Sequence, residues 1–213
     1  MVRKKYKGVS NDKERSKAKL IQAVGKVIKT KGYTGLTATN IAKTAGLSRR
    51  LISLYFGSVD NLIRIYITGQ DYWVAAAENA EKKLSEKKPK STKSILEALL
   101  TSLFEYLSNN DEMQKVVLWQ VSESNEIMNK ICTEREKLSN SFFHLADEEL
   151  EESGKPDTDL RSVASLLLGG IYFTVLHAKA DNSTFCEMNF NRTEDQERIK
   201  KAISNILDWT YEN

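Results

Sequence analysis

The spacing of apolar residues is the feature that most constrains the fold of this chain. Apolar residues recur every three or four positions along most of its length, as on one face of an α-helix. Clear examples are the stripes over residues 20–28 and 95–107. Only two prolines, Pro89 and Pro156, interrupt the 213 residues, which leaves long stretches free to be helical. No convincing alternation predicts a strand, so the chain is expected to be all-α with about nine helices.

The charge is divided sharply along the chain. Residues 1–56 carry fourteen Lys and Arg against two acids, a net charge of +12, whereas the remainder carries 18 basic and 27 acidic residues, a net charge of −9. Concentrated positive charge binds polyanions by releasing the counterions condensed on their phosphates. A basic N-terminal part followed by an acidic remainder predicts that nucleic acid binds only the N-terminal part of the protein.

Two short helices are predicted within the basic part. Thr37 is a good N-cap for a helix over 38–45, and Gly46 can supply the left-handed residue that ends it. Ser48 then repeats the cap for a helix over 49–56. Two short helices joined by a tight glycine-containing turn are typical of a helix-turn-helix, whose second helix enters the major groove of DNA.

The second of these helices has one apolar side and one side suited to DNA. Ile52 and Phe56 are four residues apart and should be buried together. On the other side, arginine can bind guanine with two hydrogen bonds, and serine can form hydrogen bonds with several base edges. The end of a leucine side chain can pack against a thymine methyl group. A tyrosine near the end of the helix can donate a hydrogen bond to a phosphate. With the two caps, the DNA-binding candidates are Thr37, Ser48, Arg49, Arg50, Ser53, Leu54 and Tyr55.

The same segment resembles the signature of TetR-type (TetR/AcrR family) transcriptional regulators. The resemblance covers about residues 15–66, and beyond them only length and helical pattern agree. It implies a helix-turn-helix domain, here over 12–60, followed by a ligand-binding and dimerisation body over 61–213. The matching stretches are Gly32-Tyr33, Ile41-Ala42, Ala45-Gly46-Leu47-Ser48, Leu51-Ile52-Ser53, Tyr55-Phe56-Gly57-Ser58 and Asp60-Asn61-Leu62.

Two positions depart from the family pattern. The family usually has a phosphate-binding lysine where this chain has Val59, and an aromatic residue or histidine where it has Leu54. The loss of one phosphate contact per subunit should weaken DNA binding and flatten its salt dependence. Arg49, Arg50 and the basic arm over 3–19 can compensate.

The last two helices are expected to form a dimer interface. The helix over 159–180 is apolar round most of its circumference, and Gly169-Gly170 permits close helix approach. An exposed apolar patch on a protein surface usually marks an interface. This pattern and the family resemblance predict a homodimer through about residues 159–211. Its two-fold symmetry predicts a pseudo-palindromic duplex DNA operator.

The resemblance also implies a cavity for a small-molecule effector in the body. The fourth helix is expected from Ser58 to about Leu84. It would transmit the effect of ligand binding to the two helix-turn-helix domains of the dimer. No residue pattern identifies the effector. The candidate lining residues are aromatic, and some of them carry a polar group on the ring. They are Trp73, Phe104, Trp119, Phe142, Tyr172 and His177.

Other functions are less consistent with the sequence. No phosphate loop, nucleophile motif or metal-ligand spacing appears, so we expect no enzyme activity, no cofactor and no metal. The basic N-terminal residues are not followed by the apolar stretch of a secretory signal peptide. The apolar run over 163–178 is shorter than a bilayer requires. A cytoplasmic protein without a membrane span is therefore expected. The alternative that stays open is a non-switching DNA-binding or adaptor protein whose helical body binds protein partners.

Overall fold

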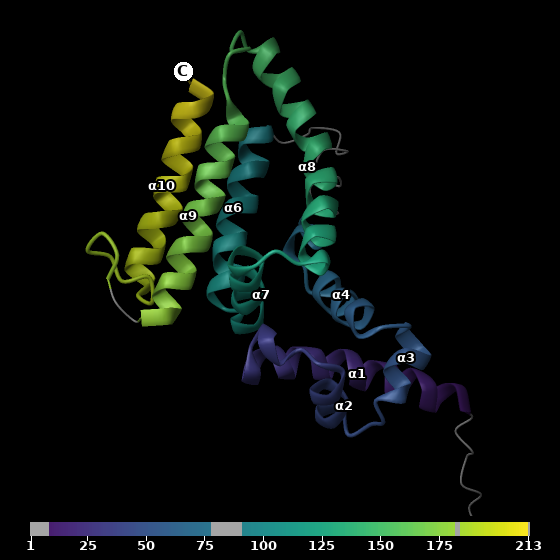
Figure 1. Ribbon diagram of the computed structural model, residues 1–213. Coiled ribbons are helices and arrows are strands. Elements are labelled where there is room, and N and C mark those ends of the chain that lie inside the picture. The colour runs from purple at the N-terminus through teal and green to yellow at the C-terminus, as the bar shows by residue number, and fades with distance from the viewer. Residues whose placement is uncertain (1–8, 78–90, 182–183, 213) are drawn as a thin grey trace, which may run out of the picture. The chain divides into compact units, whose positions relative to one another are not determined.

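The computed structural model describes residues 9–77, 91–181 and 184–212 (Figure 1). Over these ranges the chain is helical apart from short connections and one isolated pairing of Phe185 with Met188. The all-α fold expected from the sequence is therefore confirmed. The chain divides into two compact units, residues 1–70 with 119–131 and residues 71–118 with 132–213. The boundary expected at residues 60 and 61 falls inside the first unit.

The first unit is built on a long first helix. One face of this helix, with Leu20, Val24 and Val27, is completely buried and packs against the second and fourth helices. The apolar spacing that predicted the helix is thus also the spacing of its contacts. Its elements are α1 (Val9–Lys31), the 3-10 turn η1 (Tyr33–Gly35), α2 (Ala38–Ala45), α3 (Arg50–Phe56), α4 (Val59–Gly69), the end of α7 (Asp111–Ser122) and the start of α8 (Glu126–Glu152).

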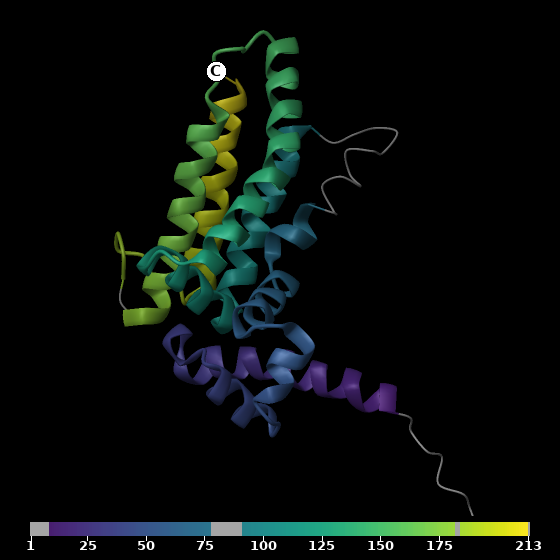
Figure 2. The same ribbon diagram turned by 45° about the vertical axis from the view of Figure 1, so that its right-hand side comes forward.

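The second unit is organised round three helices that lie side by side in both views (Figure 2). They are α6 (Thr92–Ser108), α9 (Leu160–Asp181) and α10 (Thr193–Glu212), and α6 packs on both of the others. The rest of α7 and of α8 also belongs to this unit. Its largest fully buried side chains are Ile95, Leu100, Leu103, Phe104, Leu160 and Leu207.

The fourth helix is shorter than the sequence indicated. The expectation of one helix from Ser58 to about Leu84 is wrong: α4 ends at Gly69, and a new helical segment starts at Tyr72. The Asp71 Oδ1 atom accepts a hydrogen bond from the backbone N–H of Trp73 at 2.9 Å, so Asp71 begins a new helix instead of continuing the old one. The expected residues after Ala77 lie outside the described part of the chain.

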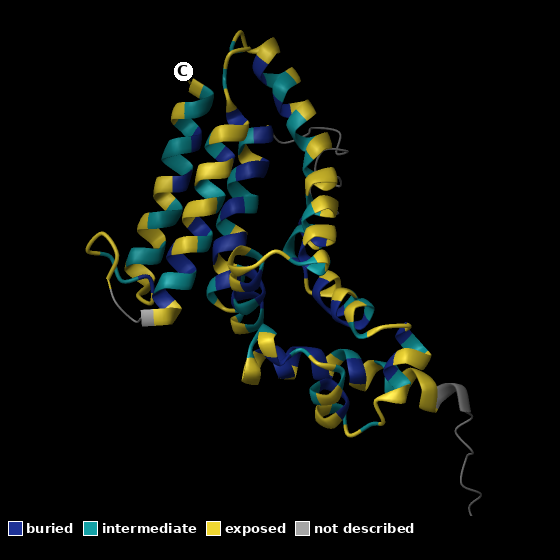
Figure 3. Cartoon of the chain, in the orientation of Figure 1, coloured by how far each residue is buried: buried dark blue, intermediate teal, exposed yellow. Residues whose placement is uncertain are grey.

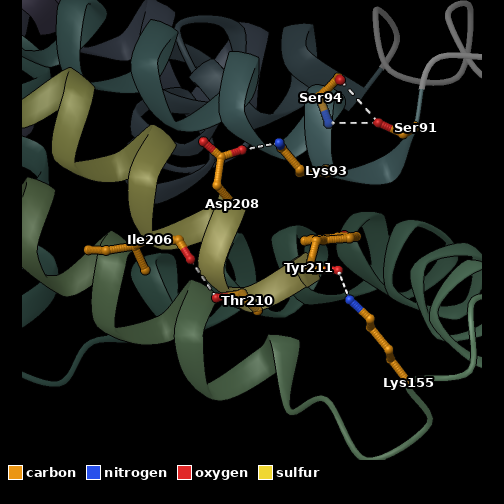
Figure 4. A network of polar contacts seen from close by, with 8 residues as sticks. All are labelled: Ser91, Lys93, Ser94, Lys155, Ile206, Asp208, Thr210 and Tyr211. Carbon is orange, nitrogen blue, oxygen red and sulfur yellow. Dashed lines mark hydrogen bonds and ion pairs between the residues drawn. The ribbon is translucent and has the colours of Figure 1, made fainter. Parts of the chain in front are cut away.

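Polar contacts hold the last turn of α10 against its neighbours (Figure 4). The Lys155 Nζ atom, in the α8–α9 connection, donates to the Tyr211 carbonyl at 2.6 Å. Lys93 of α6 forms an ion pair with Asp208, and the hydroxyls of Thr92 and Tyr211 are 2.9 Å apart. Burial raises the pKa of Tyr211. These contacts tie the end of α10 to the start of α6 and so fix which face of α10 is turned outward.

Candidate functional site

α2 and α4, the helices on either side of α3, begin with the same capping arrangement. At α2, the Thr37 hydroxyl accepts from the Asn40 N–H at 3.2 Å, and the Asn40 amide donates to the Gly35 carbonyl at 2.9 Å. At α4, the Ser58 hydroxyl accepts from the Asn61 N–H at 3.1 Å, and the Asn61 amide donates to the Phe56 carbonyl at 2.9 Å. Each asparagine therefore ties a helix start to the preceding segment.

The turn between α2 and α3 has the geometry expected of it. Gly46 adopts a left-handed conformation with φ 66°, and its N–H donates to the carbonyls of Ala42 and Lys43. α2 spans the predicted residues 38–45. α3 starts at Arg50, one residue later than expected, and the Ser48 hydroxyl accepts from the Arg50 N–H at a long 3.4 Å. The two helices and the turn together form a helix-turn-helix.

α3 buries one face and exposes the other. Ile52 and Phe56 are buried, as the spacing predicted. Leu54 on the outer face is 72% exposed. The remaining DNA-binding candidates are exposed except for the half-buried Tyr55, and they are Thr37, Ser48, Arg49, Arg50 and Ser53. Two arginines, a serine and a leucine are thus available on one short helix to a partner in solution.

The surface round this helix is strongly basic. Of the described cations of this region, Lys17 forms an ion pair with Glu14 at 3.1 Å. Val59 is half-buried at the first position of α4 and brings no positive charge there. The Val59 side chain therefore has no charged group with which to bind a phosphate. The exposed cations of the first unit include Lys13, Arg15, Lys19, Lys26, Lys29, Lys43, Arg49, Arg50 and Arg64.

A buried ion pair lies at the start of the second unit. The Asp71 Oδ2 atom accepts from both Nε and Nη2 of Arg135 of α8, each at 2.8 Å. The Asp71 side chain is 1% exposed and that of Arg135 is 17% exposed. Because a buried charge is costly without a partner, each residue depends on the other, and the pair ties the break after α4 to α8.

Two of the six candidate effector residues lie beside this pair. The indole Nε1 of Trp73 donates to the Tyr172 hydroxyl at 3.2 Å, which joins the segment after the break to α9. Burial raises the pKa of Tyr172, and the hydrogen bond from Trp73 opposes the shift. The Tyr72 ring contacts the Tyr106 ring at a tilt of 37°, with ring centroids 5.6 Å apart. Burial also raises the pKa of Tyr106, and the negative charge of Asp71 adds to the shift. The result is a cluster of aromatic side chains with hydroxyl and indole groups round one ion pair.

The other four candidates occupy different environments. Phe104 is 1% exposed in the core of the second unit, and Phe142 packs edge-on against Phe143. His177 contacts aromatic rings near the end of α9. Trp119 belongs to the first unit, where its ring stacks on Tyr33. Among these six described residues, only Trp73 and Tyr172 are joined by a hydrogen bond.

Both α9 and α10 have exposed residues on their surfaces (Figure 3), and large apolar side chains are among them. On α9, Leu166 is 78% exposed and Phe173 51% exposed, and both glycines between them are exposed. The Phe173 ring lies 5.0 Å from that of Phe185, which extends the apolar surface toward the α9–α10 connection. On α10, Trp209 is 61% exposed.

The length and hydropathy of α9 also match those of a membrane span. Residues Leu160–Ala180 have a mean hydropathy of 1.4, and 28% of their most apolar stretch is buried. They form the one helix of the described ranges that meets both criteria. The core helix of a soluble protein can have the same length and hydropathy.

Sequence reasoning missed four residues that build these sites. Asn40 and Asn61 each stand three residues after a capping Thr or Ser, and this spacing could have identified them. Asp71 follows Gly69-Gln70, a poor helix sequence, and could have been recognised as a cap. Arg135 stands in a run of charged residues and carried no signal, because only the fold brings it to Asp71.

The comparisons with known proteins agree with this arrangement. Residues 20–64 match the profile of the family described as "Bacterial regulatory proteins, tetR family". A search of curated protein sequences finds no significant match. Among solved structures, the fold is similar to that of FadR from Bacillus subtilis in complex with stearoyl-CoA, with TM-score 0.63 and 20% identity over 89% of this chain and 96% of that one.

Two further structures show the same likeness. The fatty acid degradation regulator FadR from Bacillus halodurans has TM-score 0.62 and 19% identity, with 95% of this chain and 96% of that one covered. A TetR family transcription regulator from Marinobacter aquaeolei VT8 has TM-score 0.62 and 16% identity, with 93% and 98% covered. At these identities the likeness concerns the fold.

A helix-turn-helix in a basic unit, followed by a second helical unit, is the arrangement typical of DNA-binding transcriptional regulators. The chain carries the N-terminal domain of the tetR family and has the fold of TetR-type regulators along its length. The resemblance stated from the sequence is confirmed.

Proposed function

We propose that the protein is a homodimeric repressor that binds a pseudo-palindromic operator through α3 and releases it when a small molecule binds in the second unit. We further propose that it acts in the cytoplasm. The observation that carries the proposal is the outer face of α3. Arg49, Arg50 and Ser53 are exposed there, on the second helix of a helix-turn-helix, in the unit where positive charge is concentrated. This is the arrangement that DNA reading by a recognition helix requires.

The exposed apolar side chains of α9, together with Trp209 of α10, support the homodimer. The buried residues of α9 include Ala164, Ile171 and Val175 on one side. The exposed Leu166 and Phe173 are seven residues apart and therefore share another side. Contiguous apolar surface of this kind is stabilised when a second copy covers it. A two-fold axis through these helices uses the same surface on both copies.

The cluster round Asp71 and Arg135 is the proposed effector region. Its aromatic side chains offer apolar contact area, and Trp73, Tyr172 and Arg135 offer hydrogen-bond donors that could orient a ligand. The structurally similar FadR from Bacillus subtilis was solved with stearoyl-CoA. Fatty acyl-CoA thioesters are therefore the first compounds to test.

The position of this cluster in the chain suggests how an effector could act. Asp71 is two residues beyond the end of α4 and is held by Arg135. A ligand that draws Arg135 away would free the carboxylate that fixes the break after α4. Such a ligand releases DNA only if it binds the released state more tightly than the bound state. The coupling is reciprocal, so operator DNA must weaken ligand binding by the same factor.

The experiment that tests this function is footprinting of the DNA that flanks the protein's own gene, with and without acyl-CoA thioesters. A protected inverted repeat that the ligand exposes supports the repressor. Protection that no ligand changes, in a second unit that binds no small molecule in thermal-shift screens, favours the non-switching adaptor instead. Equal ligand affinity with and without operator rejects that compound as the inducer.

A further inference from the structure

Leu54 is an unusual feature of the outer face of α3. Between residues 12 and 70, where every side chain is described, it is the only large apolar side chain that is exposed. A single exposed leucine is ordinary on a protein surface and carries no meaning by itself. The position of Leu54 is informative, because it lies one helical turn after Arg50 and next to Ser53. The most exposed apolar group of this region thus lies on the face proposed to meet base edges.

The major groove offers few partners to such a side chain. Base edges present hydrogen-bond donors and acceptors there, and the one apolar group among the four bases is the C5 methyl of thymine. Leucine has no polar atom to replace the water that it would displace from a donor or an acceptor. Against an amino group or a carbonyl it would leave that group unsatisfied, at a cost in free energy. Against a C5 methyl it buries two apolar surfaces.

We infer that Leu54 reads the C5 methyl group of a pyrimidine in each operator half-site. This inference rests on the proposed DNA-binding function and adds the chemical group that is recognised. Thymine supplies the methyl in ordinary DNA, and 5-methylcytosine carries the same group at the same position of the ring. The protein therefore distinguishes methylated from unmethylated pyrimidines at this base.

The neighbouring arginine predicts where this base lies. Arg50 and Leu54 are four residues apart, which is ~6 Å along a helix axis at ~1.5 Å per residue. Stacked base pairs are ~3.4 Å apart. If Arg50 binds guanine, the methylated pyrimidine is expected about two base pairs from that guanine. The half-site should thus contain a guanine and a thymine at close, fixed spacing.

The test removes the methyl group and nothing else. The preferred duplex is first selected from random sequences with the full chain. Each thymine is then replaced in turn by deoxyuridine in both half-sites, and binding of the wild type is compared with that of Leu54→Ala and Leu54→Met. We expect one position at which uracil weakens wild-type binding about fourfold per half-site, the factor that corresponds to ~0.8 kcal/mol for one buried methyl-sized group.

The variants and a second base provide the controls. Leu54→Ala should lose most of the sensitivity to uracil, and Leu54→Met, which stays apolar and of similar volume, should keep it. At the same position, a cytosine duplex should bind more tightly once its C5 is methylated. Uracil that is tolerated at every position, with specific binding intact, overturns this inference alone. A chain that selects no duplex overturns the proposed function, and the inference with it.

Discussion

The indole of Trp119 lies parallel to the ring of Tyr33, with ring centroids 5.7 Å apart and ring planes 6° from parallel. Trp119 is 8% exposed, and its Nε1 donates to Glu123 Oε1 at 3.0 Å. The stack joins the end of α7 to the 3-10 turn that follows α1. Residues 119–131 are thereby part of the first unit, although they are separated in sequence from the rest of it.

This stack should contribute measurably to stability. We expect Tyr33→Leu and Trp119→Leu each to destabilise the protein, and the double variant to lose less than the sum. Stacked aromatic pairs contribute ~0.5–1.5 kcal/mol beyond their buried area, and the coupling energy should lie in that range. Urea unfolding of the four proteins measures it. Strictly additive losses would show that the two rings do not stabilise each other.

Tyr72 should titrate later than an ordinary tyrosine. Burial raises its pKa from 10.0 to about 12, and a hydrogen bond with Ser102 opposes the shift only partly. Its hydroxyl also donates to the Leu99 carbonyl at 2.6 Å. Between the two pKa values the unfolded chain loses this proton and the folded chain keeps it. The stability contribution of Tyr72 is therefore complete below pH ~10 and is lost as the pH rises toward ~12.

Absorbance of phenolate during an alkaline titration checks this expectation. The wild type should contain a late component near pH 12, and in Tyr72→Phe this component should be smaller by one tyrosine. The variant should also lose less stability than the wild type over the same rise in pH. If the difference titration places Tyr72 near pH 10, the hydroxyl is not buried as the structure describes.

The oligomeric state should depend on the exposed face of α9. We expect the wild type to sediment at about twice 24.2 kDa at micromolar concentration. Leu166→Glu and Phe173→Glu should sediment as monomers, because a charge on each copy would be buried in the interface. The matched control is Val121→Glu, since Val121 is 65% exposed but lies in the first unit. A wild type that is monomeric, or glutamate variants that stay dimeric, would contradict the interface.

Gly46, in the turn between α2 and α3, should be difficult to replace by alanine. Nothing lies within 4 Å of the place of its Cβ, so alanine would meet no steric clash with other residues. The left-handed backbone at φ 66° still costs a residue with a Cβ ~1–2 kcal/mol. Gly69→Ala is the control, because Gly69 has ordinary helical backbone and open space round it. Thermal unfolding should show a lower midpoint for Gly46→Ala and an unchanged or higher one for Gly69→Ala.

The parts of the fold that sequence could predict are those set by local chemistry. α2 was predicted to the residue, because a Thr cap and a left-handed glycine mark its two ends. The buried side of α3 followed from the four-residue spacing of Ile52 and Phe56. Such features depend on neighbouring residues and on helical geometry alone.

The parts that were missed depend on contacts between distant residues. The apolar stripe on both sides of Asp71 favoured one continuous helix, whereas the ion pair with Arg135, 64 residues away, accompanies the break. Trp119 was expected in an effector cavity because aromatic residues suit one. Its stack on Tyr33 depends on how α7 returns to the first unit, which no local pattern encodes.

The central claim is that the outer face of α3 reads DNA, and the affinity of the Arg49→Ala, Arg50→Ala double variant for the selected duplex tests it most directly. Each good bidentate contact contributes ~1–3 kcal/mol, so the double variant should bind at least about thirtyfold more weakly and with a flatter salt dependence. A control that replaces the exposed Lys137 and Lys179 of the second unit with alanine should bind like the wild type. Unchanged affinity of the arginine variant would contradict the account, because DNA would then be read elsewhere or not at all.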